Sequence, residues 1–317
     1  MSYPNTFPAP FVTNPTLTAI TIAYKNSKLI ADDVMPRVPV DVPTFNYSVF
    51  NKADSFTIPD TKVGRKSAVN EVDYSVTQTA AFVEDHALDQ VVPERDKAIA
   101  QAYNSPIDPQ SIAAEQVSDL LALDREARVS NIIFNANSYA SANKTTLSGT
   151  SQWSDFTNSD PVSAILNAMD TMMIRPNQMI IGRPTFTKLS THPKVVQAWH
   201  GNNGAYGVAP ADFIASLLGL DEVLIGEDWY NAAKKGQTVN PTRVWGKHAA
   251  LLYKAPVSVS TQSMSFGVTA QWGGRIAATY FDEKRGMRGS SVVRVGESVK
   301  EIVLANDLGY FFQNAIA

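Results

Sequence analysis

Four histidines are the residues of this sequence best suited to acid–base or metal chemistry: His86, His192, His200 and His248. None of them lies in a His-Glu-x-x-His motif, and the spacing of His192 and His200 matches no common metal-binding pattern. The sequence also has no Gly-x-Ser-x-Gly nucleophile elbow, and it contains no cysteine. We therefore predict no hydrolytic triad, no metal site, no disulfide and no thiolate nucleophile.

Two further patterns could support catalysis but lack the arrangement that catalysis needs. Segment 201–207 is rich in glycine, yet it has no Gly-x-x-x-x-Gly-Lys-Ser/Thr phosphate-binding motif. Acidic residues occur in adjacent pairs, whose side chains point to opposite faces of a strand: Asp32-Asp33, Glu84-Asp85, Asp221-Glu222 and Glu227-Asp228. We expect a protein that is not an enzyme and binds no cofactor; a hydrolase that uses one of the histidines is the alternative from a different functional class.

Basic residues form two groups in turn-rich segments. Lys62, Arg65 and Lys66 form the first, and Lys284, Arg285 and Arg288, with Arg294 nearby, form the second. Range 45–90 carries four basic and seven acidic residues, so the second group could contact this acidic range in a neighbouring copy. The other interpretation is a charged loop between two strands.

The composition indicates a surface that something else covers. The chain has 317 residues, of which 18% are charged, whereas an ordinary domain has about 25%. A lone globule with so few charges is poorly protected against association. The net charge of −3 provides no general positive field, which disfavours sequence-specific nucleic-acid binding, and no stretch is apolar enough to predict a membrane span.

The N-terminal range 1–43 is expected to be a largely extended arm. It contains seven of the 18 prolines. Asn14-Pro15 predicts the start of one short amphipathic helix, in which Leu17, Ile20 and Tyr24 share a face. The rest of the arm has apolar residues but no core of its own, so we expect it to lie on another surface.

Range 44–80 predicts a long, one-sided β-hairpin. Phe45, Tyr47 and Val49 alternate with polar residues before the tip, and Val72, Tyr74 and Val76 do so after it. An isolated two-stranded ribbon is only marginally stable in water. We therefore expect the hairpin to project from the body and to lay its apolar face on a partner chain, with Tyr74 among the contacts.

A long helix is predicted over 109–139, with an apolar stripe and a charged face. The stripe consists of Val117, Leu120, Leu123, Ala127 and Phe134, and the charged face of Glu115, Asp119, Arg125 and Arg128. A polar stretch, 143–159, then predicts an internal boundary.

The remaining chain mixes helices with strands. Helices are predicted over 161–173, 184–190 and 211–218, and strands over 179–181, 223–225 and 243–253. Strands are also predicted over 276–281, 291–295 and 302–304, separated by Gly286, Gly289 and Gly296. The predicted fold class is α+β.

This order of elements, together with several local strings, resembles the major capsid proteins of tailed bacteriophages, which have the Hong Kong 97-type fold. The strings are Ile30-Ala-Asp-Asp-Val-Met-Pro36, Asn177-Gln-Met-Ile-Ile-Gly182, His192-Pro193, Val244-Trp245-Gly246 and Asp307-Leu-Gly-Tyr-Phe-Phe312. The resemblance implies an N-arm at 1–43, an E-loop at 44–80, a P-domain at 81–159 and 266–317 with its spine helix at 109–139, and an A-domain at 160–265.

The resemblance also implies function and partners. Subunits of this family form the pentamers and hexamers of an icosahedral head around double-stranded DNA, so we expect a structural protein of the virion, assembled in the cytoplasm of the host bacterium. Expected partners are other copies of the chain, a portal, packaged DNA bound without sequence specificity, and a decoration protein as a further candidate. Because the chain begins at Met1 and reaches the arm directly, we expect a separate scaffolding protein.

Two points stay open at the level of the sequence. Some relatives form Lys–Asn crosslinks, and Lys62 and Lys66 lie at the hairpin tip, but the sequence does not locate the matching Asn and Glu. The runner-up function is the shell of an encapsulin-type compartment, which shares the fold but encloses enzymes. The Pro-rich arm and the long hairpin favour the viral shell.

Overall fold

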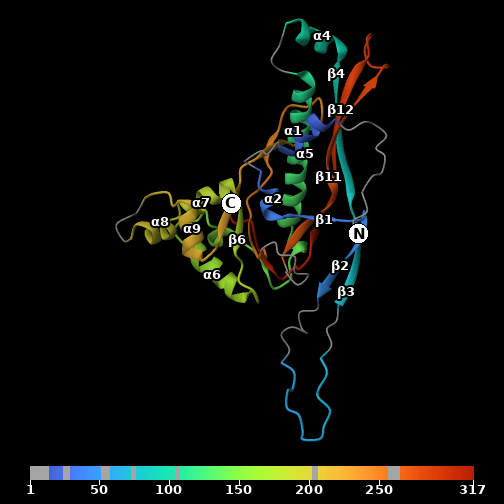
Figure 1. Ribbon diagram of the computed structural model, residues 1–317. Helices are drawn as coiled ribbons and strands as arrows, with labels where there is room; N and C mark the ends of the chain where they lie inside the picture. The colour runs from blue at the N-terminus through green and yellow to red at the C-terminus, as the bar shows by residue number, and fades with distance from the viewer. Residues whose placement is uncertain are drawn as a thin grey trace.

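The computed structural model describes residues 14–23, 29–50, 58–72, 76–103, 108–201, 206–255 and 265–317. It has the predicted α+β class. Figure 1 shows a tall layer of long strands and one long helix, a compact α/β body to one side, and a hairpin that leads away below. Among the described residues, none of the helices combines the length and the apolar character that crossing a membrane would require.

The described part of the arm forms three short elements. Helix α1 (Pro15–Ala23) begins as predicted, because the Asn14 side chain accepts hydrogen bonds from the backbone N–H groups of Thr16 (3.0 Å) and Leu17 (3.3 Å). Helix α2 (Ala31–Val34) and strand β1 (Arg37–Val40) follow. Leu17 is buried, so the arm packs on the tall layer rather than standing free. Tyr24 lies outside the described residues.

The hairpin is formed by β2 (Thr44–Phe50) and β3 (Val76–Phe82), which pair from Thr44↔Phe82 to Phe50↔Val76. The first strand agrees with the prediction, whereas β3 begins only at Val76, the last of the three alternating residues predicted for the second limb. Range 58–72 contains no strand and is exposed throughout. A turn closes the tip, where the Ser67 N–H donates to the Gly64 carbonyl oxygen at 3.0 Å.

The tall sheet has the order β1-β11-β12-β4. It combines β4 (Glu84–Pro93) with two long strands, β11 (Gly267–Asp282) and β12 (Ser290–Val303). The prediction that Gly296 separates two strands is wrong, because β12 continues through it. A Cβ on Gly296 would lie 2.9 Å from the Ala87 Cβ on β4, so the glycine permits a close approach of the two strands.

Helix α5 (Pro109–Ile133) packs on this sheet and ends earlier than the predicted residue 139. Side chains that follow the helix bond to the carbonyl groups of its last turn: the Ser138 hydroxyl donates to Ile132 O (2.7 Å), and the Tyr139 hydroxyl donates to Ile133 O (2.7 Å). A short 3₁₀ turn, η1 (Ala136–Ser138), takes the place of further helix. Helix α4 (Glu94–Ala102) precedes α5.

The predicted faces of α5 are partly wrong. Val117 is buried as expected, but Leu120 is 57% exposed, and Arg125, predicted on the charged outer face, is 2% exposed. The buried face instead contains Ala113, Ala114, Val117, Leu121, Val129 and Ile133. The buried stripe of α5 is therefore rotated relative to the predicted one, and it includes the charged residues Arg125 and Glu126.

The body surrounds a five-stranded sheet of order β5-β13-β10-β6-β7. Its strands are β5 (Lys144–Thr146), β6 (Gln178–Gly182), β7 (Glu222–Gly226), β10 (Ala249–Leu252) and β13 (Gly309–Gln313). The surrounding helices are η2 (Gly149–Ser151), α6 (Pro161–Thr171), α7 (Arg183–Ser190), α8 (Pro193–His200) and α9 (Ala211–Leu218).

Most body elements agree with the sequence analysis, with three differences. Helix α8 was not predicted, and the predicted strand 243–253 is divided between β9 (Pro241–Arg243), which pairs with β8 (Trp229–Asn231), and β10. The C-terminal range 266–317 contributes to both sheets, since β13 lies beside β10 in the body. The chain therefore crosses from the tall layer back into the body before it ends.

A glycine in the body provides a test of this packing. An ideal Cβ on Gly226 would lie 2.1 Å from Cγ of Trp245, a side chain that is fully buried. We expect Gly226→Ala to displace the indole and to lower the free energy of unfolding by about 1–3 kcal/mol. Differential scanning fluorimetry should show a clearly lower Tm. The matched control is Gly274→Ala, because nothing lies within 4 Å of its Cβ position; equal Tm losses for both variants would contradict the packing argument.

Candidate assembly surfaces

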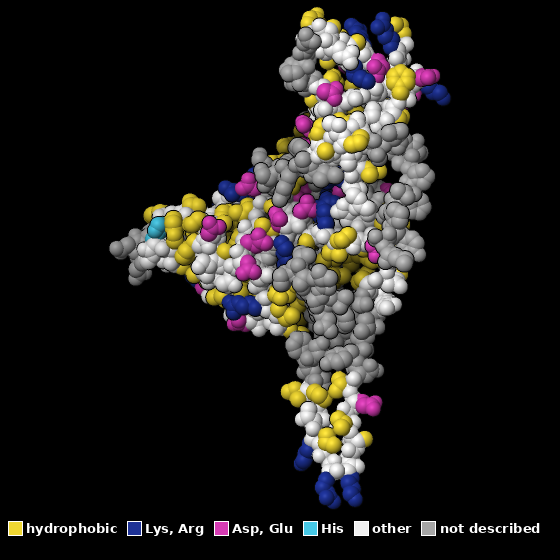
Figure 2. Space-filling model, viewed as in Figure 1, with side chains coloured by type: hydrophobic (Ala, Val, Ile, Leu, Met, Phe, Trp, Pro, Cys, Tyr) yellow, Lys and Arg dark blue, Asp and Glu magenta, His cyan; other side chains and the backbone are white. Residues whose placement is uncertain are grey.

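The hairpin tip presents basic and apolar side chains to solvent. Lys62, Arg65 and Lys66 are all exposed, while Ile58 is 92% and Val69 is 72% exposed. Figure 2 shows the apolar side chains along the tip and the basic ones at its far end. None of the described residues of the chain covers this surface. Tyr74, the remaining predicted contact on the hairpin, lies outside the described residues.

Hydrogen bonds within the tip hold its two limbs together. The side chain of Asp60 accepts a hydrogen bond from the Lys62 N–H at 2.9 Å, and the Asn70 amide donates to the Asp60 carbonyl oxygen at 2.7 Å. Asp60 therefore stabilises the conformation of the tip through its own hydrogen bonds. The three basic side chains project beyond it.

The second predicted group, Lys284, Arg285 and Arg288, lies in the β11–β12 tip (residues 282–290), at the opposite end of the tall layer (Figure 1). Arg285 pairs with Asp282 of the same tip at 2.9 Å. Within the part of the chain that the structure describes, neither Lys284 nor Arg288 has an ion pair. The structure thus does not bring the two basic groups together within one copy.

Arg294 belongs to its own sheet. Its guanidinium group donates to both carboxylate oxygens of Asp89 at 2.7 Å, across the β12–β4 pair. A bidentate pair of this kind fixes strand register, so Arg294 is removed from the group that could contact a neighbour.

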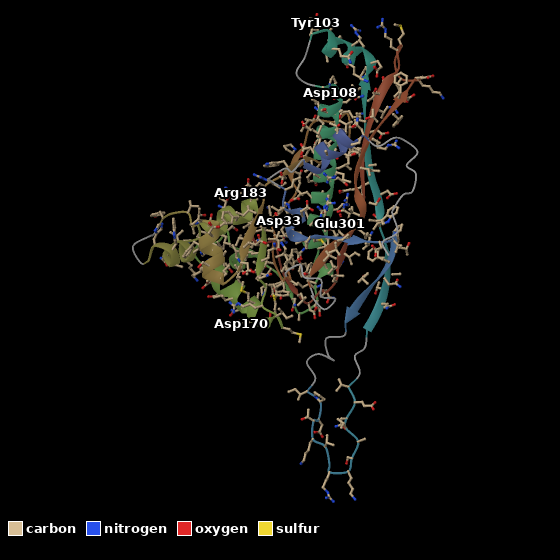
Figure 3. The ribbon with its side chains drawn as sticks, viewed as in Figure 1. Asp33, Tyr103, Asp108, Asp170, Arg183 and Glu301 are labelled. Atoms are coloured by element: carbon tan, nitrogen blue, oxygen red, sulfur yellow. The ribbon has the colours of Figure 1, made fainter. Side chains whose placement is uncertain are left out.

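The β11–β12 tip is also apolar. Met287 is 95% exposed and Phe281 is 53% exposed. Tyr103, at the end of α4, is 83% exposed and lies at the same end of the molecule (Figure 3). The hairpin tip and the β11–β12 tip therefore both combine basic groups with apolar side chains, a composition typical of surfaces that contact other chains.

Two inward-pointing residues of α5 hold the arm in place. The buried carboxylate of Glu126 accepts hydrogen bonds from the N–H groups of Ile30 (3.0 Å) and Ala31 (2.8 Å) at the start of α2, and from Trp245 Nε1 at 2.5 Å. It therefore joins the arm, the long helix and the body. Burial raises the pKa of Glu126, although these hydrogen bonds oppose the rise.

The neighbouring Arg125 binds the other end of α2. Its guanidinium group pairs with Asp32 and donates to the Met35 carbonyl oxygen (3.2 Å) and to the Thr269 hydroxyl (3.1 Å). The sequence analysis did not identify Arg125 and Glu126 as anchors. One available signal was the spacing, because Glu126 lies three residues before Val129 and seven before Ile133, on the buried face.

A second ion network lies within the tall sheet and joins its edge strand β1 to β11 and β12. Glu297, whose side chain is 1% exposed, pairs with Arg37 at 2.8 Å and with Arg275 at 3.2 Å. Burial would raise the pKa of Glu297, but the two guanidinium groups hold it below the ordinary range. Burial likewise opposes ionisation of Asp32, yet Arg125 and Arg37 lower the pKa of that carboxyl.

The histidines have structural contacts. His192, which precedes α8, accepts a hydrogen bond from the Lys194 N–H at 3.3 Å and lies 3.1 Å from the Ser159 hydroxyl. His248 accepts one from the Asn314 N–H at 2.9 Å, and His86 lies 3.3 Å from Arg128. No group of three or more His, Cys, Asp or Glu side chains suited to a metal ion occurs among the described residues.

Comparisons with known proteins agree with this arrangement. A family model described as phage major capsid protein E matches residues 128–284. The chain is 47% identical over 309 residues to the major capsid protein of Pseudomonas phage JBD67. The aligned region covers 98% of this chain and 99% of the phage JBD67 protein.

Solved structures show the same fold at lower identity. A phage-related protein from Bordetella bronchiseptica RB50 has a TM-score of 0.73 and 22% identity, covering 97% of this chain and 98% of the other. The capsid of cyanophage P-SCSP1u has a TM-score of 0.59 and 12% identity, covering 98% of this chain and 92% of the other.

The Glu297 network predicts a loss of stability on mutation. We expect Glu297→Gln to lower the free energy of unfolding by about 3 kcal/mol at pH 7, because it removes the counter-charge of the largely buried Arg275 and leaves Arg37 with Asp32 as its remaining ion-pair partner. Chemical denaturation of the full chain measures this. The matched control is Glu227→Gln, which removes a half-exposed ion pair with Arg183 and should cost less than about 1 kcal/mol.

The same network determines the sign of its pH dependence. The pKa of Glu297 is lower in the folded chain than its ordinary value of 4.5, so its stabilisation is present above that pH and is lost as the pH falls through the folded pKa. The difference between wild type and Glu297→Gln should therefore shrink in acid. A difference that stays constant down to about pH 2 would contradict the ion-pair explanation.

Proposed function

The chain belongs to the family of phage major capsid proteins and has the Hong Kong 97-type capsid fold, and from this premise we propose that it builds the shell of a phage head. The observation that supports this most directly is the exposure of the two tips. Ile58 on the hairpin tip and Met287 on the β11–β12 tip are more than nine-tenths exposed. A monomer gains nothing from such surfaces, whereas a shell subunit covers them with neighbours.

The finer assignments follow the family. We infer that 1–43 is the N-arm and 44–80 the E-loop, that 81–159 and 266–317 form the P-domain, and that 160–265 forms the A-domain. The subunits then assemble into pentamers and hexamers around double-stranded DNA, in the cytoplasm of the host bacterium, with a separate scaffolding protein and a portal as partners and a decoration protein as a further candidate. The net charge of −3 supports enclosure of DNA without tight binding to it.

The contacts between copies are proposed from the two basic groups. Lys62, Arg65 and Lys66 reach a neighbour from the hairpin tip, and Lys284, Arg285 and Arg288 do so from the β11–β12 tip. The ion pair of Arg285 with Asp282 makes Arg288 the better probe of the second tip. Tyr74 is retained as a proposed contact of the hairpin.

Electron microscopy tests the proposed function. Expressed full-length chain, or phage particles that contain it, should show closed shells of uniform size. A compartment of the encapsulin type would enclose proteins instead of DNA, so nucleic-acid content distinguishes the two shells. A monodisperse monomer that forms no shell with or without the phage's other head proteins would overturn the proposal.

Charge reversal tests the two tips separately. We expect Lys66→Glu and Arg288→Glu each to reduce the yield of shells severalfold while leaving the Tm of the unassembled chain unchanged, because neither side chain has an internal ion pair among the described residues. Sedimentation measures the assembled fraction. The charge-preserving changes Lys66→Arg and Arg288→Lys should assemble normally, and normal assembly of either reversed variant would remove that tip from the contacts.

A further inference from the structure

A polar hollow of about 410 Å³ lies where the end of α5, the turn η1, the segment after β9 and strand β13 meet. It opens at the surface and has a size within the range of ligand sites. We call it the amide hollow, after the side chains that line it: Asn131, Asn135, Asn137 and Gln313, together with Arg243 and His248. None of the described residues that line it carries a carboxylate.

The imidazole of His248, which lines the hollow, has a donor group available. Its Nδ1 accepts a hydrogen bond from the Asn314 N–H at 2.9 Å, which assigns the proton of the neutral ring to Nε2. Burial lowers the pKa of His248, so the ring is neutral at pH 7. Within the described residues, the Nε2–H group has no acceptor.

The amide side chains also have donor groups to spare. Asn135 uses its Oδ1 to accept from the Asn137 N–H (2.9 Å), and Gln313 uses its Oε1 to accept from the Thr146 hydroxyl (3.1 Å). Each therefore keeps its NH₂ group for another partner. Asn131 is exposed, and its side chain makes no hydrogen bond with the described part of the chain.

The described lining of the hollow contains one positively charged side chain, Arg243, and no acidic one. The Arg243 guanidinium lies 4.0 Å from the centre of the Trp229 ring and donates to the Glu227 carbonyl oxygen. The carboxylate of Glu227 is already paired with Arg183 at 2.9 Å, so it does not neutralise Arg243. Lys144 Nζ donates to the carbonyl oxygen of Ala136, one of the lining residues, at 2.9 Å, and so places a second positive charge beside the hollow.

We propose that the amide hollow binds a carboxylate carried by an acidic peptide segment of another protein. A guanidinium group with several neutral N–H donors suits a carboxylate, which accepts through both oxygens. Amide side chains both donate and accept, so they can also bond to the peptide backbone. A nucleic-acid backbone would need a row of basic residues, and the lining holds one guanidinium group. This binding does not depend on shell formation.

Fluorescence anisotropy with the unassembled full chain tests the proposal. The probe is a labelled tetraglutamate peptide, and the reference is the tetraglutamine peptide of the same length. We expect the glutamate peptide to bind at least about tenfold more tightly. Asn131→Asp and Asn137→Asp should each weaken its binding about tenfold, because a negative charge a few ångströms from the bound carboxylate repels it by about 1.4 kcal/mol.

The matched control is Asn167→Asp, which places the same charge on the exposed face of α6, outside the hollow. It should bind the glutamate peptide as wild type does. Each variant's Tm should equal that of wild type. If one of the two hollow variants misfolds, the other still tests the proposal, because the two changes lie at different positions. Equal affinity for the two peptides, or unchanged binding in both hollow variants, would overturn the proposal. So would displacement of the peptide by inorganic phosphate at equal concentration, because the site would then serve a free anion.

Discussion

The described fold depends on charges that the long helix α5 carries inward. Arg125 and Glu126 are adjacent in sequence, and both are buried at the junction of arm, tall layer and body. Glu126 bonds to the first N–H groups of α2 and to the Trp245 indole, while Arg125 pairs with Asp32 and bonds to the Met35 carbonyl oxygen. A buried charge without partners costs several kcal/mol, so these three parts of the chain are stable only when they are in place together. A segment as short as 29–40, which has no core of its own, thereby becomes part of a single fold.

The hairpin tip and the β11–β12 tip, in contrast, leave their charged and apolar side chains exposed. Their apolar side chains are exposed and their basic groups have few partners in the same chain, although the composition is only 18% charged. Such tips remain uncovered in one copy, which is consistent with the proposed shell, where each tip meets a different neighbour. The amide hollow differs from the buried ion networks, because neutral donor groups and one guanidinium line it and paired charges do not.

Elements with strong local signals could be predicted from the sequence. Helix α9 has the predicted bounds, the short apolar strands β6 and β7 lie within one residue of theirs, and Asn14-Pro15 begins α1. The errors occur where specific side-chain contacts decide the outcome. The end of α5 depends on the hydroxyl groups of Ser138 and Tyr139, six residues beyond the carbonyl groups they bind, and Gly296 was interpreted as a separator although it allows β12 to approach the remote Ala87.

The sequence by itself determined the α+β class, the projecting hairpin, and the two basic groups in turns, because these follow from periodicity and local composition. Of the arm that was predicted to be largely extended, residues 1–13 lie outside the described residues, and the described part contains helices α1 and α2. Only the tertiary structure decided that Arg125 and Glu126 point inward, that Arg294 is bound to Asp89, and that the Asn-rich segment after α5 faces His248. The reason is physical. The periodicity of the sequence indicates on which face of a helix or strand a residue lies. Whether a charge on that face can be buried depends on a partner from a remote part of the chain, and only folding brings that partner within reach.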